Sequence, residues 1–297
     1  MTGNLAPPVH LVDASFFVFR AYYSVGIEMT DGDGQPVNAL YGFGRFLGDL
    51  IEEAKPAHLA VAFDESLSSS FRNEIYPAYK ANREPAPPEL KRQFGLCREL
   101  CRLLGIAEFS SPRYEADDII GTIATRLRGS GHHAVLITRD KDLAQLVRDG
   151  DHYWDYAGER RYGYDEIERE FGVRPERMAD YLAPTGDAVD NIPGVPGVGP
   201  KTASALLREF ASLEEIYDGL DRVAGLPIRG AGRLPEKLRA HRDAAWFARR
   251  LTTIACDMPL DVSLQSLARR KPDLRALHAF YDQARFGPAL RRQAERL

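Results

Sequence analysis

VHLVDAS, residues 9–15, is the first of three similar stretches and sets the pattern of the fold. HLAVAFDES (residues 58–66) and HHAVLITRD (residues 132–140) repeat its features. Each is a short apolar run with β-branched residues that ends in polar residues, which is typical of a buried parallel strand. Longer amphipathic stretches at residues 39–54, 89–105 and 116–131 lie between them and predict helices. The alternation predicts an α/β fold with a doubly wound parallel sheet.

The pattern changes after residue 150. HYWDYAGERRYGY (residues 152–164) predicts a small hairpin, and DEIEREFGV (residues 165–173) predicts a helix capped by Asp165. Beyond Pro175 the sequence is typical of helices interrupted by glycine and proline. We therefore expect an α/β domain at residues 1–177 and a mostly helical domain at residues 178–297.

The segment at residues 66–93 does not suit a packed sheet, because it mixes prolines with basic and aromatic residues. Two interpretations stay open for it: an ordinary surface excursion, or a mobile element that binds substrate.

The composition excludes several classes of protein. With 44% hydrophobic and 28% charged residues the chain is typical of a soluble globular protein. It has no apolar run near the roughly 20 residues of a membrane span. Its start, MTGNLAPPVH, lacks the pattern of a signal peptide, and its three cysteines form neither a disulfide framework nor a paired zinc spacing. We expect a cytoplasmic protein, most simply a monomer, with no membrane contact.

The charge is distributed unevenly along the chain. Residues 222–297 hold 16 Lys and Arg against 7 Asp and Glu, whereas the rest of the chain holds 23 against 36. The basic region is either a solvated surface or a contact for nucleic acid. The acidic part would suit a cation site.

Acidic residues follow all three predicted strands and recur at two later places. Because the carboxyl ends of parallel strands meet at one edge of a sheet, the strand-end aspartates should lie close together. YEADDII places further acids at the start of a helix, where negative charge is favourable, and TGDAVDN places two aspartates three residues apart. The nine candidates are Asp13, Asp64, Glu115, Asp117, Asp118, Asp140, Asp142, Asp187 and Asp190.

If these carboxylates converge, they need cations, because like charges a few ångströms apart raise each other's pKa. A ligand set made only of oxygen favours Mg²⁺ or Mn²⁺ over Zn²⁺. Two such ions would activate a water and stabilise the leaving oxygen of a phosphodiester. The acids therefore predict metal-dependent hydrolysis.

GDAVDNIPGVPGVGPKTASALL, residues 186–207, comes close to the phosphate-binding loop of a nucleotide site. Gly194 and Gly199 have the required spacing, but Pro200 stands before Lys201, and Pro196 and Pro200 remove amides that such a loop would donate. We therefore expect no nucleotide cofactor. The glycines instead permit a hairpin turn, and Pro200 suits the first position of a helix whose amides bind one phosphate of DNA.

Six motifs in order resemble the 5′ nuclease family, which includes the 5′-3′ exonuclease domain of bacterial DNA polymerase I, phage 5′ nucleases and flap endonucleases. They are LVDAS, AFD, SFRNEIYPAYKANR, YEADD, TRDKDL and TGDAVDNIPGVPGVGPKTA, and the resemblance runs from about Val9 to at least Asp261. It implies a PIN-like sheet with a helical arch near residues 66–93, followed by a helix-hairpin-helix motif near residues 184–208. It also implies a 5′-3′ exodeoxyribonuclease or structure-specific flap endonuclease that uses two Mg²⁺ ions, for which Mn²⁺ can substitute.

The resemblance also implies roles for individual residues. One metal would be held by the residues Asp13, Asp64, Glu115, Asp117 and Asp118, and the second by Asp140, Asp142, Asp187 and Asp190. Lys80 and Arg83 match positions that contact the scissile phosphate, and with Asp117 and Asp140 they are the expected catalytic residues. Arg20 and Arg72 match further phosphate contacts, and Tyr79 would stack on a base.

The helix-hairpin-helix motif is expected to hold a K⁺ ion and one DNA strand. The backbone positions that match the K⁺ site are Pro184, Thr185, Pro193, Val195 and Val198. The positions that match the DNA contact are Gly197, Val198, Gly199, Pro200, Lys201 and Thr202.

The sequence departs from the family at Arg139, where a small residue usually precedes the aspartate. This arginine would either point to solvent or perturb metal affinity. Because no polymerase module follows, we expect a free-standing nuclease. Two alternatives stay open: a non-catalytic DNA-binding protein of the same fold, and a PIN-type ribonuclease.

Overall fold

The computed structural model describes residues 6–24, 28–65 and 68–297, so Ser66, which ends the second predicted strand and starts the predicted arch, lies outside the described residues. A six-stranded sheet has the order β3-β2-β1-β4-β5-β6. The strands are β1 (Val9–Asp13), β2 (His58–Asp64), β3 (Ala107–Ser111), β4 (Ala134–Ile137), β5 (His152–Asp155) and β6 (Arg160–Gly163). Strands β1 to β5 all run parallel, and β6 pairs antiparallel with β5.

The predicted doubly wound sheet is confirmed, and its strand order positions the site. The chain builds β1, β2 and β3 in one direction and then returns to place β4 on the other side of β1. In such sheets ligands bind beyond the carboxyl ends of the strands, at the point where the order reverses. Here that point lies between β1 and β4.

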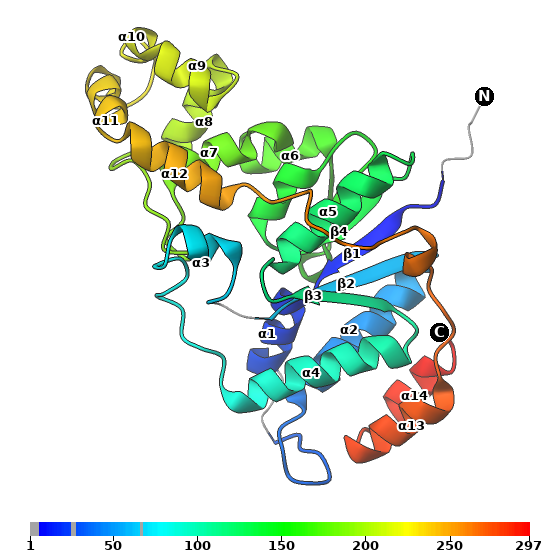
Figure 1. Cartoon of the computed structure of the whole chain (residues 1–297). Helices are drawn as coiled ribbons and strands as arrows, with labels where there is room; N and C mark the ends of the chain where they lie inside the picture. The colour runs from blue at the N-terminus through cyan, green and yellow to red at the C-terminus, as the bar shows by residue number, and fades with distance from the viewer. Residues whose placement is uncertain (1–5, 25–27, 66–67) are drawn as a thin grey trace, which may run out of the picture.

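Helices cover both faces of the sheet, which explains why the central strands β1, β2 and β4 are mostly apolar. On one face lie α1 (Ala14–Ser24), α2 (Asn38–Ala54) and α4 (Pro88–Leu103), and on the other lie α5 (Ala116–Arg128) and α6 (Tyr164–Phe171) (Figure 1). Within β1, Leu11 packs into the core beneath α5, and Val12 packs into the core beneath α2. The sheet edge above these cores is therefore rigidly supported.

Short elements complete this part of the chain. The 3₁₀ helices η1 (Lys141–Leu146) and η2 (Tyr156–Gly158) follow β4 and β5, and α3 (Phe71–Ile75) lies between β2 and α4. The predicted hairpin is confirmed as β5 and β6. The expected cap at Asp165 is wrong: α6 begins at Tyr164 with Gly163 as its N-cap, and the Gly163 amide donates to the Glu166 side chain at 2.6 Å.

The helical part begins with η3 (Pro175–Arg177) and contains six α-helices. These are α7 (Met178–Thr185), α8 (Pro200–Glu209), α9 (Leu213–Asp218), α10 (Leu220–Val223), α11 (Leu234–Ala240) and α12 (Arg242–Thr252), with η4 (Ala231–Arg233) before α11. A hairpin joins α7 to α8, and α12 packs across α7.

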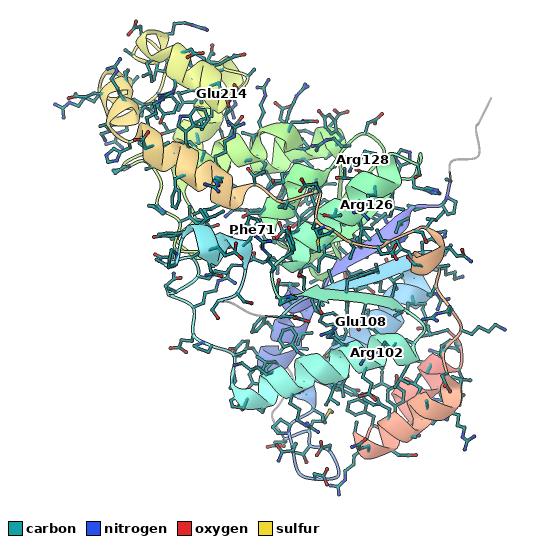
Figure 2. All side chains as sticks on the ribbon, in the orientation of Figure 1. Phe71, Arg102, Glu108, Arg126, Arg128 and Glu214 are labelled. Atoms are coloured by element: carbon teal, nitrogen blue, oxygen red, sulfur yellow. The ribbon has the colours of Figure 1, made fainter. Side chains whose placement is uncertain are left out.

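The chain then returns to the sheet. After α12 it passes along α5, where the Arg126 side chain donates to the carbonyls of Met258 and Leu260 (Figure 2). It then forms η5 (Gln265–Leu267), α13 (Leu274–Gln283) and α14 (Pro288–Ala294).

The last two helices pack against α4 and α2, so the expected division at residues 177 and 178 needs a correction (Figure 1). Leu277 of α13 and Leu290 of α14 belong to the same hydrophobic core as α2 and α4. Gly48 on α2 gives α14 room, since a Cβ there would lie 2.3 Å from the Gln293 side chain. Residues 274–297 therefore pack with the α/β part. Among the described helices, none has the length and apolarity that a bilayer span requires.

Candidate active site

Three aspartates stand at the ends of neighbouring strands, as expected. Asp13 ends β1 and accepts a hydrogen bond from the Thr138 hydroxyl at 2.9 Å. Asp64 ends β2 and accepts from the Ser15 hydroxyl at 2.7 Å. Asp140 follows β4 and caps η1. The strand register thus brings three carboxylates to one edge.

The start of α5 adds acidic residues to this edge. Glu115 is the N-cap of α5, and the backbone amide of Ala116 donates to Asp64 at 2.8 Å. This bond ties the beginning of the helix to the end of β2. Asp117, in the first turn, faces the same space, where the positive end of the helix dipole favours a carboxylate.

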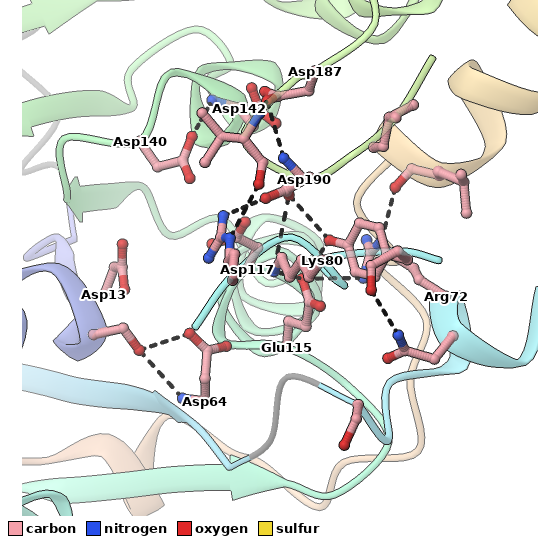
Figure 3. Close-up of a pocket in the computed structure, with 18 of the residues that line it drawn as sticks. Asp13, Asp64, Arg72, Lys80, Glu115, Asp117, Asp140, Asp142, Asp187 and Asp190 are labelled. Atoms are coloured by element: carbon pink, nitrogen blue, oxygen red, sulfur yellow. Dashed lines mark hydrogen bonds and ion pairs between the residues drawn. The ribbon is translucent and has the colours of Figure 1, made fainter. Parts of the chain in front are cut away.

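The hairpin between α7 and α8 supplies the opposite side. Asp187 pairs with Ile192 through two backbone hydrogen bonds of 2.9 and 2.7 Å. The intervening residues form a tight turn in which the Asp187 side chain accepts from the amide of Val189 at 2.8 Å. This turn directs Asp187 and Asp190 toward the sheet edge (Figure 3).

Eight of the nine predicted acids line one cavity of about 1060 Å³. Figure 3 shows these acidic side chains around one space, with Lys80 beside Glu115. The eight are Asp13, Asp64, Glu115, Asp117, Asp140, Asp142, Asp187 and Asp190.

Asp118 is the exception, and its partner is Arg72. The guanidinium of Arg72 forms two hydrogen bonds of 2.8 Å with the Asp118 carboxylate, and neither side chain is more than 3% exposed. Asp118 also accepts from the amides of Glu115 and Ala255 at 3.0 and 2.9 Å. Its lone pairs are therefore occupied by the protein.

Arg72 also lines the cavity, where its guanidinium lies 3.7 Å from Glu115, but the side chain is only 3% exposed and its donors are engaged by the protein. Its remaining donors reach the carbonyls of Leu251 and Thr253 at 2.7 and 3.1 Å. The buried pair thus joins α3, the start of α5 and the end of α12. Because breaking such a pair leaves an uncompensated buried charge, it fixes these three elements together.

Lys80 and Arg83, between α3 and α4, are among the basic side chains that face the acids. The Lys80 ammonium lies 2.9 Å from Glu115 and 3.9 Å from Asp190, and the Arg83 guanidinium is paired with Asp190. Tyr79 is 3% exposed, and its hydroxyl donates to Glu115 and Asp190 at 3.0 and 3.2 Å, so its ring offers no open face for stacking.

The other predicted contacts lie at the margin. Arg20 is exposed on α1 and is not among the residues that line the cavity. Arg139 lies at the rim, where its guanidinium pairs with Asp155 at 3.2 Å. Thr138, Ser15 and Lys141, which bind the predicted acids, were missed by the sequence reasoning. Their positions one or two residues from an acid in LVDAS and ITRDKD could have marked them.

The cavity carboxylates shift one another's pKa values. Burial, together with the charges of Asp64 and Asp140, raises the pKa of Asp13 to about 7. Burial and neighbouring carboxylates also raise the pKa of Asp117 well above its usual range. Burial alone would raise the pKa of Glu115 too, but Lys80 and Arg72 outweigh it and lower that pKa. The protein therefore supplies too little positive charge around Asp13 and Asp117 to keep their pKa values in the usual range, whereas Lys80 and Arg72 balance Glu115.

The donor set fits divalent metal ions. All eight groups are carboxylates, the ligands that Mg²⁺ and Mn²⁺ prefer. The Oδ1 atom of Asp142 is buried without a hydrogen-bond partner, and an ion would satisfy it. Within the described residues, no three acidic, histidine or cysteine side chains already stand close enough to enclose a metal.

The hairpin before α8 has the predicted shape. Gly199 is the N-cap of α8 and Pro200 its first residue, and Gly197 has a positive φ of 82°. Gly194 packs so tightly against the preceding helix end that a Cβ would lie 2.5 Å from the Thr185 carbonyl. Lys201 is exposed in the first turn of α8, whereas the Val195 and Val198 side chains are buried.

Comparison with known proteins covers nearly the whole chain. Residues 8–172 match the family model of the 5′-3′ exonuclease N-terminal resolvase-like domain, and residues 173–275 match that of the 5′-3′ exonuclease C-terminal SAM fold. DNA polymerase I of Rhizobium leguminosarum is 37% identical over 292 residues, which are 96% of this chain and 28% of the polymerase. The thermostable DNA polymerase I of Thermus filiformis is 38% identical over 286 residues, covering 96% of this chain and 33% of the polymerase. The chain thus spans about a third of the length of these relatives.

Solved structures share the fold. The T5 D15 protein, co-crystallised with metal ions, superposes with a TM-score of 0.66 at 21% identity and covers 97% of both chains. The catalytic core of Rad2 in complex with a DNA substrate superposes with a TM-score of 0.64 at 17% identity, covering 98% of this chain and 91% of that one. At these identities the likeness is one of fold.

Proposed function

The chain belongs to the 5′-3′ exonuclease family, and we propose that it hydrolyses phosphodiester bonds of DNA at 5′ ends and 5′ flaps with the help of divalent metal ions. The observation that carries this proposal is the cavity at the reversal point of the sheet, where eight carboxylates face Lys80 and Arg83. The relatives are DNA polymerases I, and two neighbours of the same fold were crystallised with metal ions or DNA.

The acids divide between two ion positions in this proposal. Asp13, Asp64, Glu115 and Asp117 would hold one Mg²⁺, and Asp118 would support them from behind through Arg72. The residues Asp140, Asp142, Asp187 and Asp190 would hold the second Mg²⁺, and Mn²⁺ would substitute at both. Bound divalent ions supply an activated water and stabilise the charge on the leaving oxygen.

The basic side chains orient the substrate. Lys80 and Arg83 pair with the cavity acids, and a phosphate would offer them the same kind of partner. A scissile phosphate would therefore replace the carboxylates as the partner of Lys80 and Arg83. Arg83, with a side chain 36% exposed, is the more accessible of the two.

The hairpin between α7 and α8 holds the duplex. Amides at the start of α8 and the exposed Lys201 bind one backbone phosphate without reading its sequence. Carbonyls of residues Pro184, Thr185, Pro193, Val195 and Val198 would hold a K⁺ ion that supports this contact. Asp187 and Asp190 belong to the same hairpin. The segment that would bind the duplex therefore also contributes acids to the cavity.

The test is to incubate a 5′-flap duplex with the protein in Mg²⁺, in Mn²⁺ and in EDTA, beside a single-stranded RNA of equal length. We expect cleavage of the flap DNA in both metals, none in EDTA, and little cleavage of the RNA. Absence of metal-dependent cleavage would contradict the proposal, and preferred cleavage of the RNA would favour a ribonuclease.

A further inference from the structure

Two segments that are far apart in the sequence lie against each other at the cavity. The first, here called the strap, is residues 78–83 and carries Lys80 and Arg83. The second, here called the turn, is residues 187–191 and belongs to the hairpin before α8. Figure 3 shows Lys80 of the strap beside Asp190 of the turn.

The strap and the turn are joined by hydrogen bonds from two asparagine side chains, one in each segment. The Asn191 amide donates to the Ala78 carbonyl at 2.7 Å, and the Asn82 amide donates to the Ala188 carbonyl at 2.9 Å. Between these bonds the backbone amide of Lys80 donates to the Asp190 carbonyl at 3.0 Å. These three hydrogen bonds join the two segments, in addition to the side-chain contacts of Lys80 and Arg83 with Asp190.

Both segments bend through a left-handed residue. Lys80 has a φ of 56°, and Asn191 has a φ of 57°. This conformation is unfavourable for a residue with a side chain, less so for asparagine than for lysine. The strained Lys80 is the residue whose amide is held by the turn, so the contact maintains the bend that points its ammonium at the acids.

A small apolar cluster lies next to the contact between the strap and the turn. Tyr79 of the strap packs with Ile192, directly after the turn, and with Ala248 and Leu251 of α12. The Tyr79 hydroxyl donates to Asp190 at 3.2 Å. The strap is thus supported both by the turn and by the helical part.

We propose that Asn82 and Asn191 are positioning residues that dock the strap on the turn, so that the hairpin that grips the duplex and the two cations of the cavity move as one unit. The benefit for catalysis rests on the proposed function, whereas the docking itself does not. A duplex bound at α8 would thereby fix where Lys80 and Arg83 stand.

Two variants test this docking. Asn191→Gly removes the amide but keeps the left-handed backbone accessible. Asn82→Ala lies at an exposed position and leaves the core intact. The matched control is Glu74→Ala, which removes an exposed ion pair with Arg113 next to the strap and does not reach the turn.

The first measurement is amide hydrogen exchange of residues 78–83. Without DNA we expect exchange about 3- to 10-fold faster in Asn191→Gly, a smaller increase in Asn82→Ala, and none in Glu74→Ala. A duplex without a flap should protect residues 78–83 in the wild-type protein and not in Asn191→Gly. Unchanged exchange in both asparagine variants would overturn the inference.

The second measurement is single-turnover cleavage of a 5′-flap duplex, with duplex affinity measured in EDTA. Asn191→Gly should slow cleavage about 3- to 10-fold with unchanged affinity, and should cause no further loss when combined with Lys80→Ala. A loss confined to affinity, or one that adds fully to that of Lys80→Ala, would contradict a positioning role. If the wild-type protein cut no DNA, the proposed function would fail, while the exchange in DNA-free protein would still decide the docking.

Discussion

The two sides of the acidic cavity are built in different ways. On the sheet side, neutral groups hold the carboxylates: the Thr138 hydroxyl binds Asp13, and the Ser15 hydroxyl binds Asp64. On the turn side, cations hold them: Lys141 lies 3.2 Å from Asp187, and Arg83 pairs with Asp190. Around Asp13 and Asp64 the sheet side is therefore short of positive charge, although Lys80 and Arg72 lie close to Glu115. The aspartates of the turn side are already paired with cations.

The largest effect is expected on the sheet side. Asp117→Ala or Asp140→Ala should reduce cleavage of a 5′-flap duplex about 1,000-fold or more, since ion stabilisation is worth several kcal/mol. DNA binding should persist, because losing a carboxylate reduces repulsion of phosphate. Asp187→Asn, on the turn side, should cost only about 10-fold.

Single-turnover rates and affinities in EDTA measure these changes, with the exposed Asp149→Ala as the control. If Asp187→Asn reduced the cleavage rate as much as Asp117→Ala does, the proposed difference between the sheet side and the turn side would be wrong.

The next effect concerns stability behind the sheet side. Arg72→Ala should lower the free energy of unfolding by about 3–5 kcal/mol, because it leaves Asp118 charged and buried without its partner. Arg113→Ala, which breaks an exposed pair with Glu74, should cost at most about 1 kcal/mol. Urea unfolding of both variants checks this, and equal losses would show that the Arg72 pair does not fix the sheet side.

A pH effect follows from the uncompensated charge on the sheet side. Because folding raises the pKa of Asp13 from about 3.8 to about 7, its stabilising contribution is complete below about pH 4 and is lost as the pH rises through 7. Mg²⁺ should therefore increase the free energy of unfolding more at pH 7.5 than at pH 5. The difference between the two pH values should be on the order of a few kcal/mol.

Thermal unfolding with Mg²⁺ and with EDTA at both pH values measures this difference. Asp13→Asn serves as the control and should reduce the pH dependence. A gain from Mg²⁺ that shrinks with rising pH would contradict the assignment of unbalanced charge to the sheet side.

The smallest effect is expected beyond the turn side, at the start of α8. Lys201→Ala should weaken duplex binding a few-fold and reduce the slope of affinity against salt concentration by about one. Lys271→Ala, an exposed lysine near the start of α13, is the control. Titrations at several salt concentrations decide the matter, and an unchanged slope would remove Lys201 from the DNA contact.

The sheet was predictable where a buried strand is followed by an acid. β1, β2 and β4 have this pattern, and parallel pairing then places their ends together. β3 (AEFSS) was missed because it is an edge strand whose residues are all only partly buried, so its sequence shows little apolar character. The positions of α13 and α14 could not be predicted either, since an amphipathic helix does not reveal which surface covers its apolar face.

The acids were predictable as a group but not one by one. Asp117 and Asp118 are adjacent and equally suited to a helix start, yet one faces the cavity and the other binds Arg72. Only the fold brings together residues 46 positions apart in this way. The same holds for Tyr79, whose aromatic ring predicted stacking, while its hydroxyl and its burial give it a structural position.

The return of the chain from α12 to α13 has a mechanical consequence. It makes the helical part an insertion, joined to the sheet by one connection near residues 172–177 and by a second at residues 253–273, rather than a tail on a single linker. A body tethered at two points rotates about the line through both and cannot swivel freely as a domain on one flexible linker does. The two connections therefore limit how far the helical part that carries Asp190 can turn relative to the sheet edge.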